Sequence, residues 1–215
     1  MVTKFLYCKY NDLKNVIHDG APIRFTDINY YVKLENEKIR DDESKKDYTY
    51  TPNSISLNIN GSNIDFSNLS LTVPTRRAHL LCLSNDGYSP ELFNHFNADT
   101  CIEINVDTLI MRIKDWFKPR CENIMIKYKD VYYYTTDSKM IHDPTESVFM
   151  KQYEKYHIEN EYRVAIFYPG DDETAVIARG NIHMKLKYIE IGINDNLGMG
   201  RVIVEARRKD GSIIS

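Results

Sequence analysis

The amino-acid sequence predicts an α+β fold, with a mixed, mostly antiparallel sheet as the core and short flanking helices. Two observations predict this class: strand-type runs outnumber runs with helical period, and the helical runs are short. A chain of 215 residues is long enough to bury one substantial core. We therefore expect a single domain over residues 1–206, a hairpin insertion near residues 49–72 and a flexible tail over residues 207–215.

The first part of the chain predicts two strands with a short helix between them. Residues 4–10 read as a strand, and Asn11-Asp12 offers a cap for a helix over residues 13–18 that Gly20 ends. Residues 22–26 follow as a second strand. Residues 31–46 are charged with few apolar anchors, which predicts an exposed helix or a loop over a cleft.

Residues 54–66 carry the signature of a hairpin. Ile55, Leu57 and Ile59 alternate with polar residues up to Asn60-Gly61, and a second alternation follows that pair. Asn-Gly tolerates the positive φ angles of a tight hairpin turn. This hairpin is expected to decorate the core.

The remaining elements follow from apolar runs and helix caps. We expect helices from Ser89 through Phe96, from a cap at Asp107 through Trp116, and over residues 144–156. Residues 124–134 predict one strand or a bent pair. The other expected strands cover residues 79–84, 100–105, 161–168, 175–178, 188–193 and 202–205.

Composition narrows the classes of function. Lys and Arg total 28 against 31 Asp and Glu, a net charge of -3, so no global basic field is available to hold nucleic acid. The four scattered cysteines favour reduced thiols in a core over a zinc site or disulfides. Without an apolar signal region or a run long enough to cross a bilayer, we expect a cytoplasmic protein with no membrane partner.

Glu159 and Glu161 are the first candidate site. They lie two residues apart where a polar run turns into a strand-type apolar run, and side chains two apart on a strand share a face. Neighbouring like charges perturb each other's pKa, which is typical of functional sites. The alternative is a solvated strand start in which Glu161 pairs with Arg163 across the surface.

The order of motifs resembles a large family of bacterial and phage cytosolic proteins of unknown function. Its hallmark is a lysine and an aromatic residue followed by Glu-x-Glu-aromatic-Arg. The matching segments here are Lys151, Tyr156 and residues 159–163, together with the strand-type runs 5–10, 23–26, 82–84, 101–104 and 188–192. The resemblance covers most of the chain outside the hairpin and the tail.

A more distant resemblance is to the ADP-ribosyltransferases, which share the strand-helix-strand opening and a glutamate entering a late strand. It implies an ADP-ribosyltransferase-like fold and NAD as the substrate. Those enzymes often carry His or Arg on the first strand, whereas this chain has Tyr7, Cys8 and Lys9. Ser84 would correspond to the serine that such enzymes place near the nicotinamide ribose.

The resemblance also implies roles for individual residues. Glu161 would stabilise positive charge on the ribose, and Glu159 would orient or deprotonate the attacking group, a role that contributes roughly 10²–10⁴-fold. An aromatic face for the nicotinamide would come from Tyr7, Tyr10 or Tyr156, and the pyrophosphate would contact Arg24, Lys151 or Arg163. For each tyrosine the alternative is ordinary strand packing, and for Arg163 it is an ion pair.

The leading expectation is an NAD-dependent ADP-ribosyltransferase-like enzyme in phage-bacterium conflict. It would modify a protein or nucleic acid, or hydrolyse NAD. One alternative is a non-catalytic module that binds a nucleotide or a protein in the same cleft. Another is a metal-dependent phosphodiesterase using His157, Glu159 and Glu161, but a lone cluster of this kind is usually not a metal site, so we predict no metal. His95 is expected only to cap a helix or contact solvent.

Overall fold

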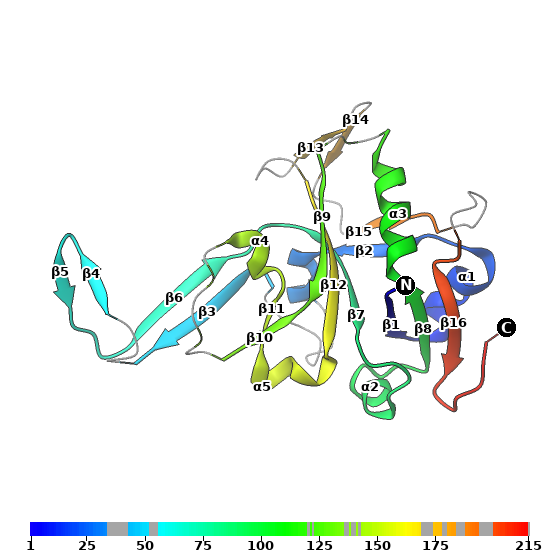
Figure 1. Ribbon diagram of the computed structural model, residues 1–215, viewed down its shortest axis with the longest axis horizontal. Helices are drawn as coiled ribbons and strands as arrows, with labels where there is room; N and C mark the ends of the chain where they lie inside the picture. The colour runs from blue at the N-terminus through cyan, green and yellow to red at the C-terminus, as the bar shows by residue number, and fades with distance from the viewer. Residues whose placement is uncertain are drawn as a thin grey trace.

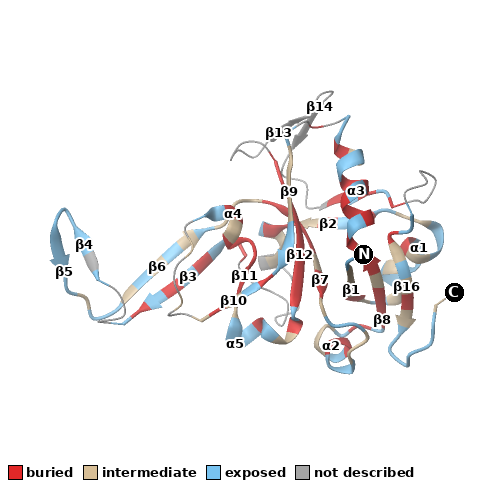
Figure 2. Cartoon of the chain, viewed as in Figure 1, coloured by how far each residue is buried: buried red, intermediate tan, exposed pale blue. Residues whose placement is uncertain are grey.

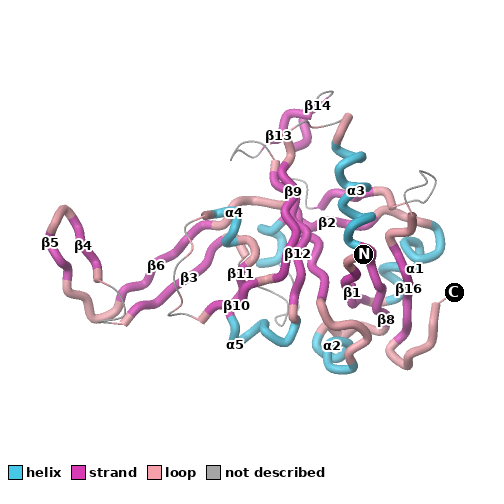
Figure 3. Tube along the Cα trace, viewed as in Figure 1, coloured by secondary structure: helices cyan, strands magenta, loops and turns pink. Residues whose placement is uncertain are grey.

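The computed structural model describes residues 1–33, 43–51, 56–119, 121, 123–135, 138, 141, 143–168, 174–177, 180–183, 188–193 and 200–214. Over these residues the chain is a mixed α+β structure whose sheets are mostly antiparallel and whose helices are short (Figures 1 and 3). The predicted coarse fold class is thereby confirmed. No helix in these ranges is both long enough and apolar enough to cross a bilayer.

One large sheet organises the described part of the chain. Its strands pair in the order β15-β2-β7-β1-β8-β16, and β12 and β9 extend it from β7. Every pair within it is antiparallel. The strands are β1 (Thr3–Cys8), β2 (Ile23–Asp27), β7 (His79–Ser84), β8 (Thr100–Asn105), β9 (Met125–Asp130), β12 (Glu161–Phe167), β15 (Tyr188–Ile191) and β16 (Ile203–Arg208).

Strand β7 has three partners, and this splits the sheet. Strand β12 pairs along one whole edge of β7, from Glu161 opposite Ser84 to Ile166 opposite His79. The other edge is shared, because β2 pairs with its beginning and β1 meets it only at Ser84. Strand β2 therefore leaves β7 after Leu80, and β1 reaches β7 only at Ser84. Side chains of β1 and β7 can border a cavity between these two points.

The two faces of β7 and β12 enter different cores. On one face Leu81, Leu83 and Val164 join the largest apolar cluster, beneath helix α3 (Val106–Phe117). On the opposite face Leu80 and Ala165 pack in a smaller cluster with residues from other segments. Every residue of β12 is buried (Figure 2), which explains why its sequence is an almost continuous apolar run.

Capping residues define some of the helix ends, but helix α1 (Tyr10–Asp19) begins after Lys9, whose side chain makes no cap hydrogen bond, so the cap expected at Asn11-Asp12 is wrong. Helix α1 ends at Gly20, whose φ of 63° is left-handed. Helix α2 (Pro90–His95) begins at Ser89, whose side chain accepts a hydrogen bond from the Leu92 N–H. Helix α3 is capped by Asn105, two residues before the expected Asp107, because the Asn105 side chain accepts from the Thr108 N–H at 3.1 Å.

The single helix expected over residues 144–156 is wrong. The segment contains helix α4 (Pro144–Ser147), strand β11 (Met150–Gln152) and helix α5 (Tyr153–Tyr156). Val148 and Phe149 turn into the smaller core, and β11 then pairs in parallel with β10 (Tyr132–Tyr134). Burial of Val148 and Phe149 thus outweighs the helical spacing of apolar residues in this segment. The pairing of β11 with β10 places Lys151 on a strand.

A two-stranded arm projects from the body (Figure 1). Strands β3 (Lys45–Tyr50) and β6 (Leu69–Pro74) form its base, and β4 (Leu57–Ile59) and β5 (Ser62–Ile64) form its tip. At the tip Asn60 and Gly61 have φ angles of 51° and 84°, as predicted for the hairpin turn. The buried face of β3 packs with Tyr134 and Met150, so the base of the arm belongs to the core.

The remaining described elements are the 3₁₀ helices η1 (Ile28–Lys33) and η2 (His157–Glu159) and a hairpin of β13 (Thr174–Ile177) and β14 (Gly180–His183). Residue 178, the end of one expected strand, lies outside the described residues. Strand β16 runs two residues past the domain boundary expected at residue 206. The chain then folds back, and the Ile214 N–H donates to the Ala206 carbonyl.

Candidate functional site

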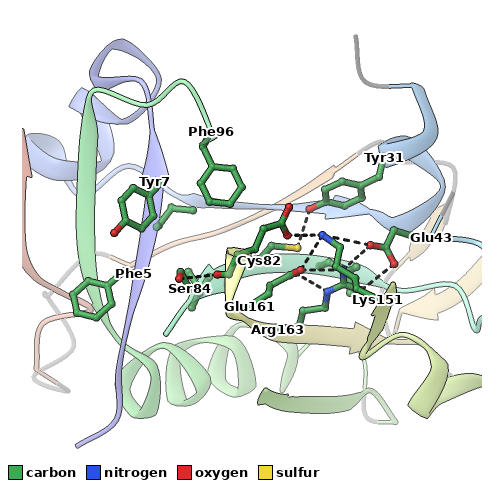
Figure 4. Close-up of a pocket in the computed structure, with 14 residues that line it drawn as sticks. Phe5, Tyr7, Tyr31, Glu43, Cys82, Ser84, Phe96, Lys151, Glu161 and Arg163 are labelled. Atoms are coloured by element: carbon green, nitrogen blue, oxygen red, sulfur yellow. Dashed lines mark hydrogen bonds and ion pairs between the residues drawn. The ribbon is translucent and has the colours of Figure 1, made fainter. Parts of the chain in front are cut away.

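A cavity of about 170 Å³ lies where β1 separates from β7. Four residues close it from other sides: Tyr31 of helix η1, Glu43 two positions before β3, Lys151 of strand β11 and Phe96 directly after α2. Figure 4 shows Phe5, Tyr7 and Phe96 on one side of this cavity, and the charged side chains together with Tyr31 on the other. The lining residues are Phe5, Leu6, Tyr7, Tyr31, Glu43, Leu80, Cys82, Leu83, Ser84, Phe96, Lys151, Glu159, Glu161 and Arg163.

The charged wall is a network of buried ion pairs. It joins three carboxylates to three cations, so the formal charges cancel. Its members are Glu43, Glu159, Glu161, Lys46, Lys151 and Arg163, each of them no more than 6% exposed. Buried charges are tolerated only when they are paired and hydrogen-bonded, and each member has such a partner.

Arg163 joins two of the carboxylates. Its Nε donates to Glu161 Oε1 at 2.6 Å, and its two terminal nitrogens donate to Glu43 at 2.5 and 3.0 Å. One of these nitrogens also donates to the Val148 carbonyl. A planar guanidinium can serve two carboxylates in this way, which an ammonium cannot.

Lys151 lies at the centre of the three carboxylates. Its Nζ is 2.6 Å from Glu159 Oε2, 3.0 Å from Glu161 Oε2 and 4.0 Å from Glu43 Oε1. The ring of Tyr156 lies beneath the ammonium, with 4.5 Å between Nζ and the ring centroid. Lys151 therefore offsets the repulsion that would otherwise push Glu159 and Glu161 apart.

The network keeps Glu43 and Glu161 ionised. Burial opposes the charge on Glu161, but Arg163 and Lys151 outweigh burial and lower the pKa of Glu161 from 4.5 to about 2. Burial also opposes the charge on Glu43, and Arg163, Lys46 and Lys151 together hold its pKa well below the usual range. In the same way the carboxylates raise the pKa of Lys151 against the effect of burial. All three groups carry full charge near neutral pH.

Glu159 and Glu161 converge by a different route from the one predicted. Glu161 is the first residue of β12, but Glu159 belongs to η2 and does not share the strand face. Between them Asn160 adopts a left-handed φ of 40°, which Asn tolerates better than most residues. The Ser84 hydroxyl donates to the Glu159 carbonyl at 2.8 Å and fixes this turn against β7.

The opposite wall of the cavity is aromatic. Phe5 and Tyr7 come from β1, and Phe96 follows α2 (Figure 4). The Tyr7 hydroxyl donates to the Asp86 carbonyl and accepts from the Ser89 N–H, both at 2.8 Å, so its polar end is satisfied away from the charged wall. Its ring is left to pack against Phe93 and Phe96.

Most of the predicted site residues meet at this cavity. Tyr7, Ser84, Lys151, Glu159, Glu161 and Arg163 all line it. Tyr156 supports Lys151 from outside the lining. Tyr10 instead pairs with His18 on α1, and Arg24 lies on β2 with its side chain 58% exposed beside Glu190. The structure does not bring Tyr10 or Arg24 to the cavity.

Several residues of the site had no clear signal in the sequence. Glu43 and Lys46 come from the charged segment expected to be exposed, yet they are 2% and 3% exposed. Lys46 alternates with Tyr48 and Tyr50 along β3, and this period could have indicated its burial. Tyr31 and Cys82 meet at 3.4 Å, and burial raises the pKa of the Cys82 thiol. His95 Nε2 lies 3.3 Å from Glu159 Oε1 rather than at a simple cap.

His157 does not join the two glutamates. Its ring is exposed and stacks on Tyr153, with 4.5 Å between the ring centroids. No group of three or more potential metal ligands occurs among the residues that the structure describes. The geometry therefore gives the phosphodiesterase alternative no support.

Gly87 sets the position of the aromatic wall. A Cβ atom at this position would overlap the ring of Phe5. We expect Gly87→Ala to destabilise the fold by about 1–3 kcal/mol, as overpacking does. Gly192→Ala is the matched control, because no atom of the described residues beyond its two chain neighbours lies within 4 Å of its added Cβ. Urea denaturation of this control should give a change within about 0.5 kcal/mol. Equal effects of both changes would contradict the close packing at Phe5.

Comparisons with known proteins add no assignment to this geometry. Neither the family models, nor the curated proteins, nor the solved structures contain a match to the chain. The function is therefore inferred from the walls of the cavity.

Proposed function

We propose that the protein is an NAD-using enzyme, similar in its chemistry to the ADP-ribosyltransferases, that cleaves the bond between nicotinamide and ribose. The observation that carries this proposal is the convergence of two buried carboxylates, Glu159 and Glu161, on one side of a cavity whose other side is aromatic. ADP-ribose would pass to a protein or nucleic acid, or to water.

The proposed reaction needs negative charge beside the sugar. The bond between ribose C1′ and the nicotinamide nitrogen breaks, and its electron pair leaves with the nicotinamide and neutralises the pyridinium ring. C1′ then bonds to the oxygen of water, which releases a proton, or to a nucleophilic atom of the acceptor. Positive charge builds up on the sugar meanwhile, and a fixed carboxylate stabilises that charge. The pKa of Glu161, about 2, makes it a weak base but a permanent anion, which suits this role.

The size of the cavity supports binding of a single ring. A dry cavity of about 150 Å³ in another protein accepts benzene, so 170 Å³ suits the nicotinamide with little room beyond it. The remainder of NAD would lie outside. Lys151 and Arg163 are held by carboxylates, so we propose them as supports of Glu159 and Glu161 rather than as contacts of the pyrophosphate.

Substitution of Glu161 tests the proposal. Purified protein with labelled NAD should release nicotinamide or label a lysate, and Glu161→Gln should lower that rate by about 10²–10³-fold. Glu190→Gln is the matched control, because Glu190 is exposed on β15 and pairs only with Arg24 among the described residues. Wild-type turnover in Glu161→Gln, or none in the wild type, would refute the assignment. Phage-bacterium conflict and the cytoplasmic location stay predictions.

A second candidate is a non-catalytic module that binds a nucleotide or a protein at the same cavity. The observation that favours it is the complete ion pairing of Glu161, which is what a structural carboxylate also shows. Calorimetry separates the two candidates. Binding of NAD or ADP-ribose without any nicotinamide release favours the module, whereas release that depends on Glu161 favours the enzyme.

A further inference from the structure

The two carboxylates of the cavity differ in how many hydrogen bonds and ion pairs they already form. Glu161 Oε1 accepts from Arg163 Nε, and Glu161 Oε2 accepts from a terminal nitrogen of Arg163 at 3.2 Å and forms an ion pair with Lys151 at 3.0 Å. Glu159 Oε2 accepts from Lys151 at 2.6 Å, and its Oε1 has the weaker contact of 3.3 Å with His95. A carboxylate can accept about four hydrogen bonds, so Glu159 keeps the larger unused capacity.

The partners of Glu161 are also harder to replace. Its fork with Arg163 belongs to the same strand face, and Arg163 is 1% exposed and joined to Glu43 as well. A ligand hydroxyl that displaced this contact would leave a buried guanidinium short of a partner. Glu159 is held by the ammonium of Lys151 and by the ring of His95. It can accept another hydrogen bond without disturbing the fork.

The backbone and the neighbours of Glu159 hold it at the cavity. The Ser84 hydroxyl fixes its carbonyl, and the left-handed Asn160 ends η2 directly after it. The ring of His95 packs edge-on against Phe96, with centroids 4.9 Å apart, and Phe96 belongs to the aromatic wall. His95 therefore links the aromatic wall to Oε1 of Glu159.

From this difference we infer that Glu159 is the carboxylate that touches the ligand, accepting a hydrogen bond from a ribose hydroxyl. Glu161 remains the fixed anion of the proposed reaction, held by Arg163 and Lys151 without accepting a hydrogen bond from the ligand. His95 is a positioning residue that orients Glu159. The inference rests on the proposed function only for the identity of the sugar. It gives Glu159 a direct contact with the sugar, whereas the sequence resemblance implies that Glu159 orients or deprotonates the attacking group.

The test removes the hydroxyl from the ligand as well as the carboxylate from the protein. Two analogues of NAD are used, lacking the 2′- or the 3′-hydroxyl of the nicotinamide ribose. In the wild type one of them should bind or react about 10–100-fold less well than NAD. In Glu159→Gln this difference between the analogue and NAD, the penalty for the missing hydroxyl, should shrink to within about 3-fold. Two groups that touch have non-additive effects, so removing the hydroxyl matters less once the carboxylate is gone. In Glu161→Gln and in the control Glu190→Gln the penalty should stay at its wild-type size.

Thermal unfolding of each variant shows whether a change in binding or turnover comes from loss of the folded protein. Glu161→Gln should lower Tm more than Glu159→Gln does, and its penalty is measured at a temperature where it is folded. The inference is overturned if the penalty disappears in Glu161→Gln but persists in Glu159→Gln, or if neither analogue differs from NAD in the wild type. Analogues that differ in binding with no nicotinamide release overturn the proposed enzyme and keep the inference. Absence of binding and turnover overturns both.

Discussion

Replacing Arg163 with methionine is expected to lower the free energy of unfolding by about 3–5 kcal/mol. Arg163 is 1% exposed and is the shared partner of Glu43 and Glu161. Without it, two carboxylates stay buried, and among the described residues Lys46 and Lys151 are the cations left to offset them. The penalty comes from these uncompensated charges, because methionine would itself pack adequately in an apolar core.

Urea denaturation at pH 7 measures this loss. Arg163→Lys keeps the charge but cannot form the fork with both carboxylates, so its loss should fall between those of the wild type and Arg163→Met. Arg24→Met is the control, since that arginine is 58% exposed and exposed pairs are worth about 0–1 kcal/mol. If Arg163→Met lowers the free energy of unfolding no more than Arg24→Met does, the ion-pair network does not stabilise the fold.

Acid should destabilise the protein steeply between about pH 4.5 and pH 2. The pKa of Glu161 is lowered from 4.5 to about 2, and that of Glu43 is lowered further by its three cations. A lowered folded-state pKa means that the unfolded chain binds protons first. The stability from each carboxylate is therefore fully present above pH 4.5 and is lost as the pH falls toward the folded-state value.

The magnitude follows from two carboxylates titrating together. Each contributes about 1.4 kcal/mol per pH unit inside this window, so the pair should remove about 4 kcal/mol between pH 4.5 and pH 3. Denaturation curves at several pH values measure the slope. Arg163→Met lacks the main cause of both lowered pKa values and should show a shallower slope. An equally steep slope in that variant would mean that other carboxylates cause the acid sensitivity.

The sequence predicted the sheet better than the site, for a physical reason. The strands β7, β8 and β12 are rich in apolar residues, so their own sequences indicate that they are buried. The turn at Asn60-Gly61 follows from the local backbone preference of these two residues. Residues 144–156 failed because helical spacing there competes with the burial of Val148 and Phe149 in a core built from distant segments. A local pattern cannot reveal such a core.

The candidate site was predicted in part. One sequence motif contains four residues that meet at the cavity, namely Lys151, Glu159, Glu161 and Arg163. Glu43 could not be predicted, because its burial depends on Arg163, which is 120 positions away along the chain. The same holds for His95, whose partner Glu159 lies 64 positions away. Ion pairs between distant residues leave no periodic trace in a sequence.

The three-way pairing of β7 has a consequence for how the protein is made. As the chain emerges from the ribosome, β1 and β2 are already available when β7 appears, but β12 follows only after β8, α3 and β9. Until then one complete edge of an apolar strand has no partner, and such an edge is a template for joining another chain. The nascent protein is therefore most vulnerable to aggregation during translation of the segment between Ser84 and Glu161, and chaperone binding would be most useful over that interval.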